Sequence, residues 1–322
     1  MINKIKGWIV ITAIAVGLQM MVTRISGYFE DILVLAGINA ILAVSLNWVN
    51  GLSGQFSLGQ AGFMAIGAYA SSYVSMFVFH SPNHSIWGQQ GVLIFSLLVG
   101  GGVSGLVGYL IGIPVLRLKG DYLAIATLGF LEIVKVVLYN VQCVGGAEGL
   151  AGIPQTTTPF LVFFILGGSV LITYRFLHSR HGRALISIRE NEVAAASLGI
   201  PTTFYKVQVF VVSAVLAGMA GGLFAHYLSY INPSSFGIMM TLEIVIMVVL
   251  GGMGSTSGSV LAAFFLTILP EALRPVQHWT GIDLRMVLYA LILIFVMIMR
   301  PQGILGCREI WDVLPRKKKN HP

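Results

Sequence analysis

The chain has 322 residues, of which 56% are hydrophobic and only 10% are charged. Soluble globular domains carry about 25% charged residues, so this composition, with a mean hydropathy of +0.86, excludes a soluble protein and predicts a membrane protein. The formal net charge is +7. Its positive residues lie mostly in short loops and at the chain ends, where membrane topology accounts for them, and we expect no nucleic-acid partner.

Apolar runs long enough to cross a membrane follow one another along the whole chain, since about 20 apolar residues span about 30 Å of hydrocarbon. Ten candidate spans are predicted, at about 7–23, 31–48, 61–80, 91–114, 121–141, 159–177, 207–231, 237–252, 257–271 and 285–300. The runs at 237–252 and 257–271 are short, so either is a candidate re-entrant segment, or the pair forms one broken helix. We expect an all-α polytopic membrane protein of eight to ten helices in a single domain over 1–322.

The first span follows Lys4 and Lys6 and resembles a signal peptide. No small-residue cleavage pattern closes it, because Gln19-Met20-Met21 is a poor site, so we expect it to be retained.

Basic residues in short loops mark the cytoplasmic side of a membrane protein. With the N-terminus inside, ten spans place most basic residues inside: Arg117, Lys119, Arg180, Arg183, Arg189, Arg300, Arg308 and the run at 316–319. The outer loops, 81–90 and 142–158, contain no Lys or Arg. Both termini are therefore predicted to be cytoplasmic, and the basic tail at 301–322 is interpreted as a lipid-headgroup anchor.

The two cysteines, Cys143 and Cys307, are predicted on opposite sides of the membrane. They cannot form an internal disulfide, and two thiols do not make a metal-ligand cluster. We expect no metal site.

A polar, glycine-rich segment at 47–60 interrupts the apolar pattern. Backbone groups freed from a helix inside hydrocarbon cost several kcal/mol each, so such a segment must be buried in protein or line a wet cavity. It is a candidate pathway or pivot element with nine candidate residues: Asn47, Asn50, Gly51, Ser53, Gly54, Gln55, Ser57, Gly59 and Gln60.

A second segment of this kind occurs at 251–259, with candidate pathway residues Gly251, Gly252, Gly254 and Ser255. Two broken segments in comparable positions indicate an internal repeat of the type that builds a central transport site. The alternative is close helix packing through small residues plus a short polar turn at the membrane surface.

Three ionisable residues fall within predicted spans, where such residues are functional candidates. Glu132 and Lys135 are three residues apart on one predicted helix and are expected to pair. Glu243 has no local partner. It is a candidate pathway residue for a cationic group or a proton, or an acceptor of hydrogen bonds from a neighbouring helix or subunit.

The segment 178–206 is long, charged and helix-prone, and it lies between two apolar runs on the predicted cytoplasmic side. Nothing in lipid requires so many Arg and Glu residues, so we interpret the segment as a docking element for a partner outside the membrane. The alternative is an ordinary solvated amphipathic helix.

Gly51-x-Ser53-Gly54 also fits the serine motif of rhomboid-type intramembrane proteases. A serine nucleophile needs a base within hydrogen-bond reach, and the histidine well inside a span is His226. Leu, Ser and Tyr follow it where that pattern requires glycines, which argues against a protease.

Five motifs in order resemble the LivM-type permease of branched-chain amino acid ABC importers. They are SLNWVNGLSGQFSLGQAGFMAIGAYAS (45–71), RLKGDYLAIATLGFLEIVK (117–135), GGAEGLAGIP (145–154), GRALISIRENEVAAASLGIP (182–201) and TLEIVIMVVLGGMGSTSGSVLAAFFLTILPEALR (241–274). The resemblance implies a bacterial inner-membrane import complex in which this permease pairs with a LivH-type permease, two cytoplasmic ATPases and a periplasmic binding protein.

The resemblance also implies a role for 178–206, because permeases of such importers carry an E-A-A-x3-G-like segment that sits in a groove of the ATPase. Here one extra residue separates the glutamate from the alanines. The implied coupling residues are Arg189, Glu190, Asn191, Glu192, Ala194, Ala195, Gly199 and Pro201. We expect one short helix within 189–201, ended by Gly199 and Pro201.

The chain has no G-x-x-x-x-G-K-[ST] loop, so the nucleotide site must lie on another subunit, and we expect no catalytic residue and no cofactor. The resemblance implies alternating access driven by ATP bound elsewhere. Related importers carry urea or other small polar solutes, and the sequence leaves that alternative open. An autonomous ion-coupled secondary transporter is a further alternative, which predicts transport that depends on Glu243.

Overall fold

The computed structural model describes residues 27–78, 86–118, 120–273, 285–300, 302–306 and 309. The predicted span at 7–23, Lys119, Cys307, Arg308 and the basic run at 316–319 lie outside these residues. Thirteen helical segments carry the architecture of the described residues: α2 (Gly27–Asn47), η1 (Trp48–Leu52), α3 (Gln60–Tyr73), η2 (Val74–Val78), α4 (Ile86–Val115), α5 (Asp121–Asn140), α6 (Pro159–Leu177), α7 (Arg180–Glu190), α8 (Glu192–Ser197), α9 (Thr202–Leu228), α10 (Ile238–Gly251), α11 (Thr256–Ala272) and α13 (Arg285–Met299).

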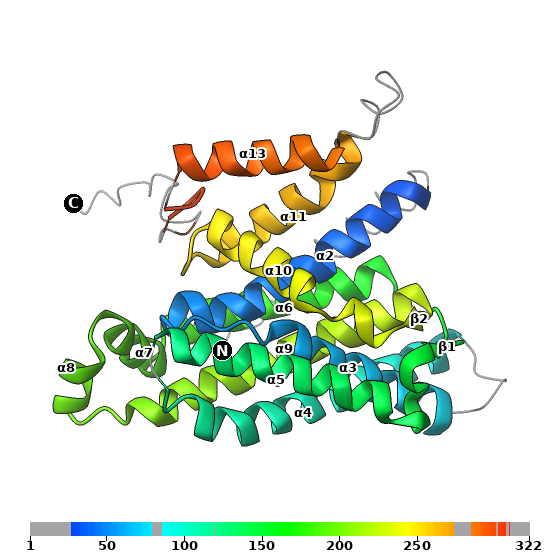
Figure 1. Ribbon diagram of the computed structural model, residues 1–322, viewed down its shortest axis with the longest axis horizontal. Helices are drawn as coiled ribbons and strands as arrows, with labels where there is room; N and C mark the ends of the chain where they lie inside the picture. Colours follow the sequence, from blue (N-terminus) through cyan, green and yellow to red (C-terminus); the bar gives the residue numbers. More distant parts are fainter. Residues whose placement is uncertain are drawn as a thin grey trace, which may run out of the picture.

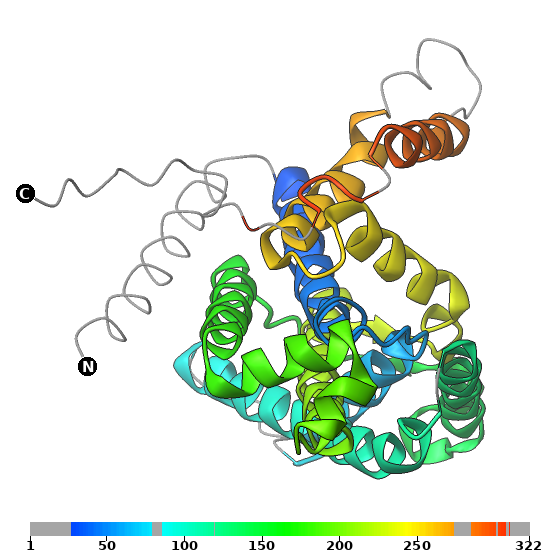
Figure 2. The ribbon, with the colours of Figure 1, turned by 90° about the vertical axis from the view of Figure 1, so that its left-hand side faces the viewer.

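Short elements fill the loops between the long helices. Three 3₁₀ turns are η3 (Gln142–Val144), η4 (Gly146–Glu148) and η5 (Pro233–Ser235), and β1 (Leu150–Ala151) pairs antiparallel with β2 (Tyr230–Ile231). The β1–β2 pair lies at one end of the body, and α7 and α8 extend from the other end (Figure 1). In Figure 2 the end that carries α7 and α8 faces the viewer.

The helices confirm an all-α polytopic membrane fold. Within the described residues, six segments are long and apolar enough to cross a membrane: Gly27–Leu52, Gln89–Val115, Asp121–Asn140, Pro159–Leu177, Thr202–Leu228 and Pro233–Gly251. The predicted spans at 61–80, 257–271 and 285–300 are also helical, as α3 with η2, α11 and α13, but are not among these six segments. The two short runs are thus separate helices, α10 and α11, joined by a turn.

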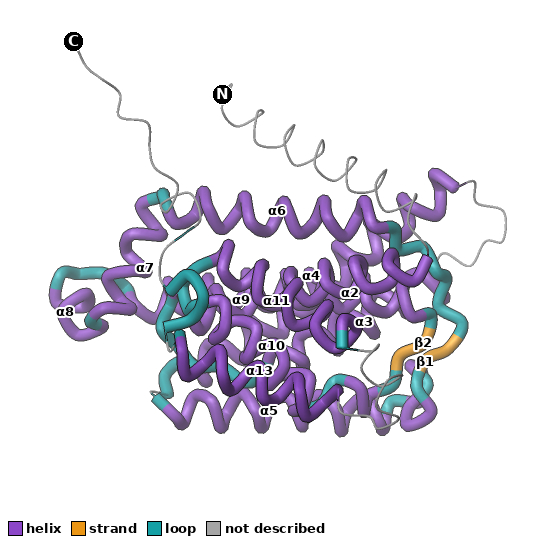
Figure 3. Tube along the Cα trace, turned by 90° about the horizontal axis from the view of Figure 1, so that it is seen from above, coloured by secondary structure: helices purple, strands orange, loops and turns teal. Residues whose placement is uncertain are grey.

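Helix α2 is the central element and packs against α6, α9, α10 and α11. Its residues from Ala36 onward are nearly all buried, so it has no solvent-facing stripe and its apolar residues occur all round the helix. Figure 3 shows α5 and α6 on opposite sides of the body, with α2, α9 and α11 between them.

Glycines allow α3, α4 and α9 to approach closely. A Cβ at Gly67 would lie 2.2 Å from the backbone of Gly218, and a Cβ at Gly221 would lie 2.0 Å from the carbonyl oxygen of Met64. Membrane helices lack a hydrophobic driving force between them, so such small-residue contacts supply the packing.

Candidate functional site

The predicted break at 47–60 begins where α2 changes to the π-helical turn η1. The chain then leaves the helix, with Gly54 at a φ of +68°. Its freed backbone groups are satisfied by protein: the Ser57 amide donates to Asn50 Oδ1 at 3.1 Å, and the Leu58 amide donates to Thr127 Oγ1 at 2.9 Å. The segment is therefore largely enclosed by other helices, as a broken helix in a membrane requires.

The second break lies between α10 and α11, where Gly252 and Gly254 have φ of +106° and +96°. The two breaks are in direct contact. The Gly254 amide donates to Asn47 Oδ1 at 2.9 Å, and a Cβ at Gly51 would lie only 2.3 Å from the Gly254 nitrogen. Both glycines are needed here, Gly254 for its backbone conformation and Gly51 for the close approach.

The segment 178–206 forms two short helices rather than one. The expected short helix within 189–201 is present as α8: α7 ends at Glu190 and Asn191 starts α8, its side chain accepting a bond from the Ala194 amide at 3.0 Å. Gly199, at a φ of +80°, ends α8, and the Ile200 amide donates to the Ala195 carbonyl at 3.2 Å. This is the helix end expected of a C-terminal glycine.

Arg189 joins this segment to the first break. Its Nη1 donates to the Gly51 carbonyl oxygen at 3.1 Å, and its Nη2 pairs with Glu190 Oε1 at 3.1 Å. Glu192 pairs with the buried Lys206 of α9 at 2.6 Å. Arg189 and Glu192 thus have partners within the chain, while the Glu190 side chain is 70% exposed.

A polar cavity of about 300 Å³ lies where the break, the start of α5 and the α7–α8 segment meet. Side chains from these three elements and from the first turns of α9 line it: Ser53, Gln55, Asp121, Arg189, Asn191 and Lys206. The structure therefore brings three segments, far apart in the sequence, to one end of the helical body.

Comparison with known proteins identifies the family of the chain. Residues 28–297 match the family described as branched-chain amino acid transport system / permease component. The chain belongs to this family.

Individual relatives agree with that assignment. The chain is 35% identical to the high-affinity branched-chain amino acid transport system permease protein LivM of Salmonella typhimurium, over 91% of this chain and 72% of the relative. It is 33% identical to LivM of Escherichia coli, over 92% and 74%. It is also 25% identical to the permease protein LivH of Salmonella typhimurium, over 85% and 93%. No solved structure matches.

The permease has a buried polar link deeper in its core. Gln60 Nε2 lies 2.6 Å from Ser45 Oγ and 3.2 Å from Ser213 Oγ, which itself donates to the Ser45 carbonyl. These bonds join α2, α3 and α9 just beyond the first break. In contrast, the buried Nδ2 atoms of Asn47 and Asn50 have no hydrogen-bond partner among the described residues.

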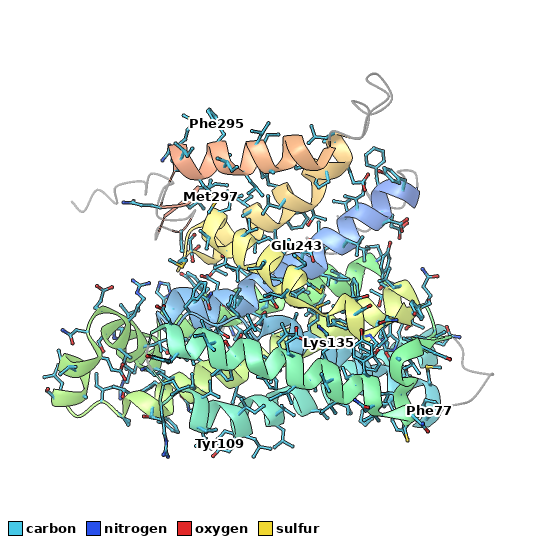
Figure 4. All side chains as sticks on the ribbon, in the orientation of Figure 1. Phe77, Tyr109, Lys135, Glu243, Phe295 and Met297 are labelled. Atoms are coloured by element: carbon cyan, nitrogen blue, oxygen red, sulfur yellow. The ribbon has the colours of Figure 1, made fainter. Side chains whose placement is uncertain are left out.

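The charged residues within the membrane helices of the permease differ in whether they have a partner. Glu132 and Lys135 form the expected pair at 2.8 Å. Glu243 is exposed on α10, two turns before the second break, and makes no hydrogen bond or ion pair within the described residues. Figure 4 shows Glu243 and Lys135 on the same face of the permease.

The remaining predicted pathway residues occupy separate places. A Cβ at Gly59 would lie 3.0 Å from the Thr127 carbonyl oxygen, so Gly59 packs against α5. A Cβ at Gly252 would lie 2.3 Å from the Gly306 carbonyl oxygen. Gly251 packs against Gly258, and Ser255 caps α11 by accepting from the Gly258 amide at 3.1 Å.

Glu309 is a residue that sequence reasoning missed. Its carboxylate is buried and accepts hydrogen bonds from the Thr256 amide at 2.8 Å, the Ser257 amide at 3.0 Å and the Ser257 hydroxyl. The Ile304 amide donates to the Leu250 carbonyl at 2.8 Å. The described part of the predicted tail therefore packs on the second break. The Ser255-Thr256-Ser257 helix start was the available signal, but nothing in the sequence linked it to a distant carboxylate.

Proposed function

We propose that this permease is the LivM-type subunit of an ATP-driven, binding-protein-dependent importer of branched-chain amino acids in a bacterial inner membrane. Family membership and the LivM relatives support this proposal. Its partners would be a LivH-type permease, two cytoplasmic ATPases and a periplasmic binding protein. Both termini would lie in the cytoplasm, and ATP would be hydrolysed only on the ATPase subunits.

The α7–α8 segment is the proposed docking element for one ATPase. It extends beyond the helix ends, and its tip carries the exposed apolar side chains Val193 and Leu198, which are 71% and 81% exposed. Exposed apolar residues on a polar segment are typical of a protein–protein contact. Glu190 adds an accessible charge beside them that suits a basic partner surface.

The bond from Arg189 to the Gly51 carbonyl is the observation that carries the proposed coupling mechanism. A shift of the α7–α8 segment on ATP binding would pull on the first break, and the Asn47–Gly254 bond would pass the movement to the second. The Glu192–Lys206 pair would move α9 with the same segment. Such a rigid-body shift of packed elements is a common form of switching between alternate states.

The two breaks form the proposed cytoplasmic gate of the substrate pathway. They lie beside the α7–α8 segment. The Nδ2 atoms of Asn47 and Asn50 in the first break have no partner among the described residues and are available as donors to a carboxylate. Glu243 lies about 12 Å along α10 from Gly251, too far to share one substrate molecule with Asn47 and Asn50, so it is the proposed acceptor for the amino group at a separate point of the pathway. The proposed substrate is thus a zwitterion with an apolar side chain.

A capture experiment tests the assembly. Wild-type permease and a variant with residues 189–199 replaced by a Gly/Ser linker are purified from native membranes. A matched control carries the same linker at 142–149, at the opposite end of the body. Wild type and control should retain ATPases and a second permease, and the 189–199 variant should lose the ATPases alone. If the wild type is purified without ATPases, an autonomous transporter replaces the importer.

A further inference from the structure

One cavity of the permease has no role in the proposed transport path. It has a volume of about 600 Å³, within the range of about 300–1,000 Å³ usual for ligand sites. It lies between α4, α6, α7 and α9 and shares no lining residue with the polar cavity at Arg189. Its walls are mostly apolar and aromatic, and the lining includes Trp48, Tyr109, Phe176, His181, Gln208 and Val211.

The cavity lies at membrane depth. Tyr109 is six residues before the end of α4 at Val115, and Gln208 is six residues after the start of α9 at Thr202. Six residues correspond to about 9 Å along a helix, or about a third of the hydrocarbon thickness. With the orientation proposed above, on which this step rests, the cavity opens into the cytoplasmic leaflet. Figure 4 shows Tyr109 at the outer edge of α4.

Two exposed arginines neighbour the cavity lining in the sequence, where α7 begins. His181 lines the cavity from the first turn of α7, and the exposed Arg180 and Arg183 are its neighbours on that helix. No acidic residue among those described pairs with either arginine. Basic side chains at the cytoplasmic surface attract anionic lipid headgroups. The two arginines therefore suit a phosphate group, while the apolar interior of the cavity suits a hydrocarbon chain.

We propose that this cavity binds an acyl chain of an anionic phospholipid from the cytoplasmic leaflet, with its headgroup at Arg180 and Arg183. Trp48 and Phe176, whose rings are 4.7 Å apart, form the apolar contact for the chain. Trp48 is the first residue of η1 in the first break, and His181 belongs to the α7–α8 segment. The bound lipid therefore contacts both parts that the proposed mechanism moves.

Site-specific photocrosslinking in native membranes tests this proposal on the full chain in its assembly. The photoreactive amino acid p-benzoylphenylalanine replaces Tyr109 at the cavity mouth. In a matched control it replaces Tyr122, which is 73% exposed at the start of α5, shortly after the end of α4 in the chain. After irradiation, the purified chain is digested and its phospholipid adducts are identified by mass spectrometry. Adducts at 109 should be severalfold richer in anionic phospholipid than adducts at 122.

Two further variants separate the chain site from the headgroup site. Val211→Trp fills the cavity and should reduce lipid adducts at 109 severalfold without changing those at 122. Arg180→Gln with Arg183→Gln should lower the anionic share at 109 to the value at 122 while adducts persist. Equal headgroup composition at both positions, or adducts at 109 with another protein segment, would overturn the lipid site. ATPase capture is scored in the same preparations, so failure of the lipid site is distinguishable from failure of the importer.

Discussion

Single residues at the contact between the two breaks determine whether the breaks can meet. Gly51 and Gly254 touch through backbone atoms, and Asn47 caps the Gly254 amide. Arg189 of the α7–α8 segment donates a hydrogen bond to the Gly51 carbonyl oxygen at the same contact. The contact therefore depends on the absence of a side chain at Gly51 and on the length of the Arg189 side chain.

We expect Gly51→Ala to destabilise the permease by about 1–3 kcal/mol, as overpacking of a tight contact does, because the added Cβ would lie 2.0 Å from Asn47 Oδ1. Gly129→Ala is the matched control, since nothing lies within 4 Å of its Cβ. It should be neutral or stabilising by up to about 1 kcal/mol through helix propensity. Thermal unfolding of the purified assembly measures both, and equal midpoints would contradict the proposed close contact.

Arg189→Lys should uncouple transport from ATPase binding. The substitution keeps the charge but shortens the reach to the Gly51 carbonyl, and a hydrogen bond from a charged donor contributes about 1.5–3 kcal/mol. Because 1.4 kcal/mol corresponds to a factor of ten, uptake should fall about tenfold while ATPase capture persists. Arg117→Lys, in the exposed turn after α4, is the control. Loss of ATPase capture would instead assign Arg189 to the docking surface.

Helices and their ends explain what the sequence could and could not predict. Spans such as 159–177 were predicted at their observed bounds because length and hydropathy define them. The break at Asn191 was not predicted, because an asparagine cap decides between one helix and two. The contacts between the breaks and the capping by Glu309 join segments more than 50 residues apart, and periodicity carries no information on such pairs. The internal repeat stays a prediction.

We expect Glu309→Ala to weaken the start of α11, since loss of an N-terminal cap costs about 0.5–2 kcal/mol. Hydrogen exchange should increase at the amides of residues 256–258 more than elsewhere. Glu148→Ala, at an exposed position in η4, should leave these amides unchanged. Unchanged exchange in the Glu309 variant would show that the bonds to Thr256 and Ser257 do not hold this helix end.

At the scale of the whole molecule, the two ends of the body differ in chemistry. One end carries the basic, polar α7–α8 segment, and the other carries the β1–β2 pair and Cys143, which is exposed and free. The positive-inside rule predicts that the first end faces the cytoplasm. This orientation would place the proposed docking segment, both breaks and the proposed lipid site on the same side.

Cysteine labelling tests the orientation. In a Cys307→Ser background, Cys143 should react with a membrane-impermeant maleimide in spheroplasts, because η3 is predicted to face the periplasm. In a cysteine-free background, Arg117→Cys should react only after the membrane is permeabilised. The reverse pattern would invert the topology and remove the docking segment from the side of the ATPases.

The double capping of α8 has a consequence for how fast and how tightly a partner can bind. Asn191 holds its first turn, Gly199 closes its last, and Lys206 anchors Glu192. A six-residue helix would not persist alone in water, yet here its shape exists before any encounter. Association then avoids most of the conformational entropy otherwise lost on ordering a loop. The affinity for the proposed partner is thus left to depend on a few side chains at the tip of the α7–α8 segment.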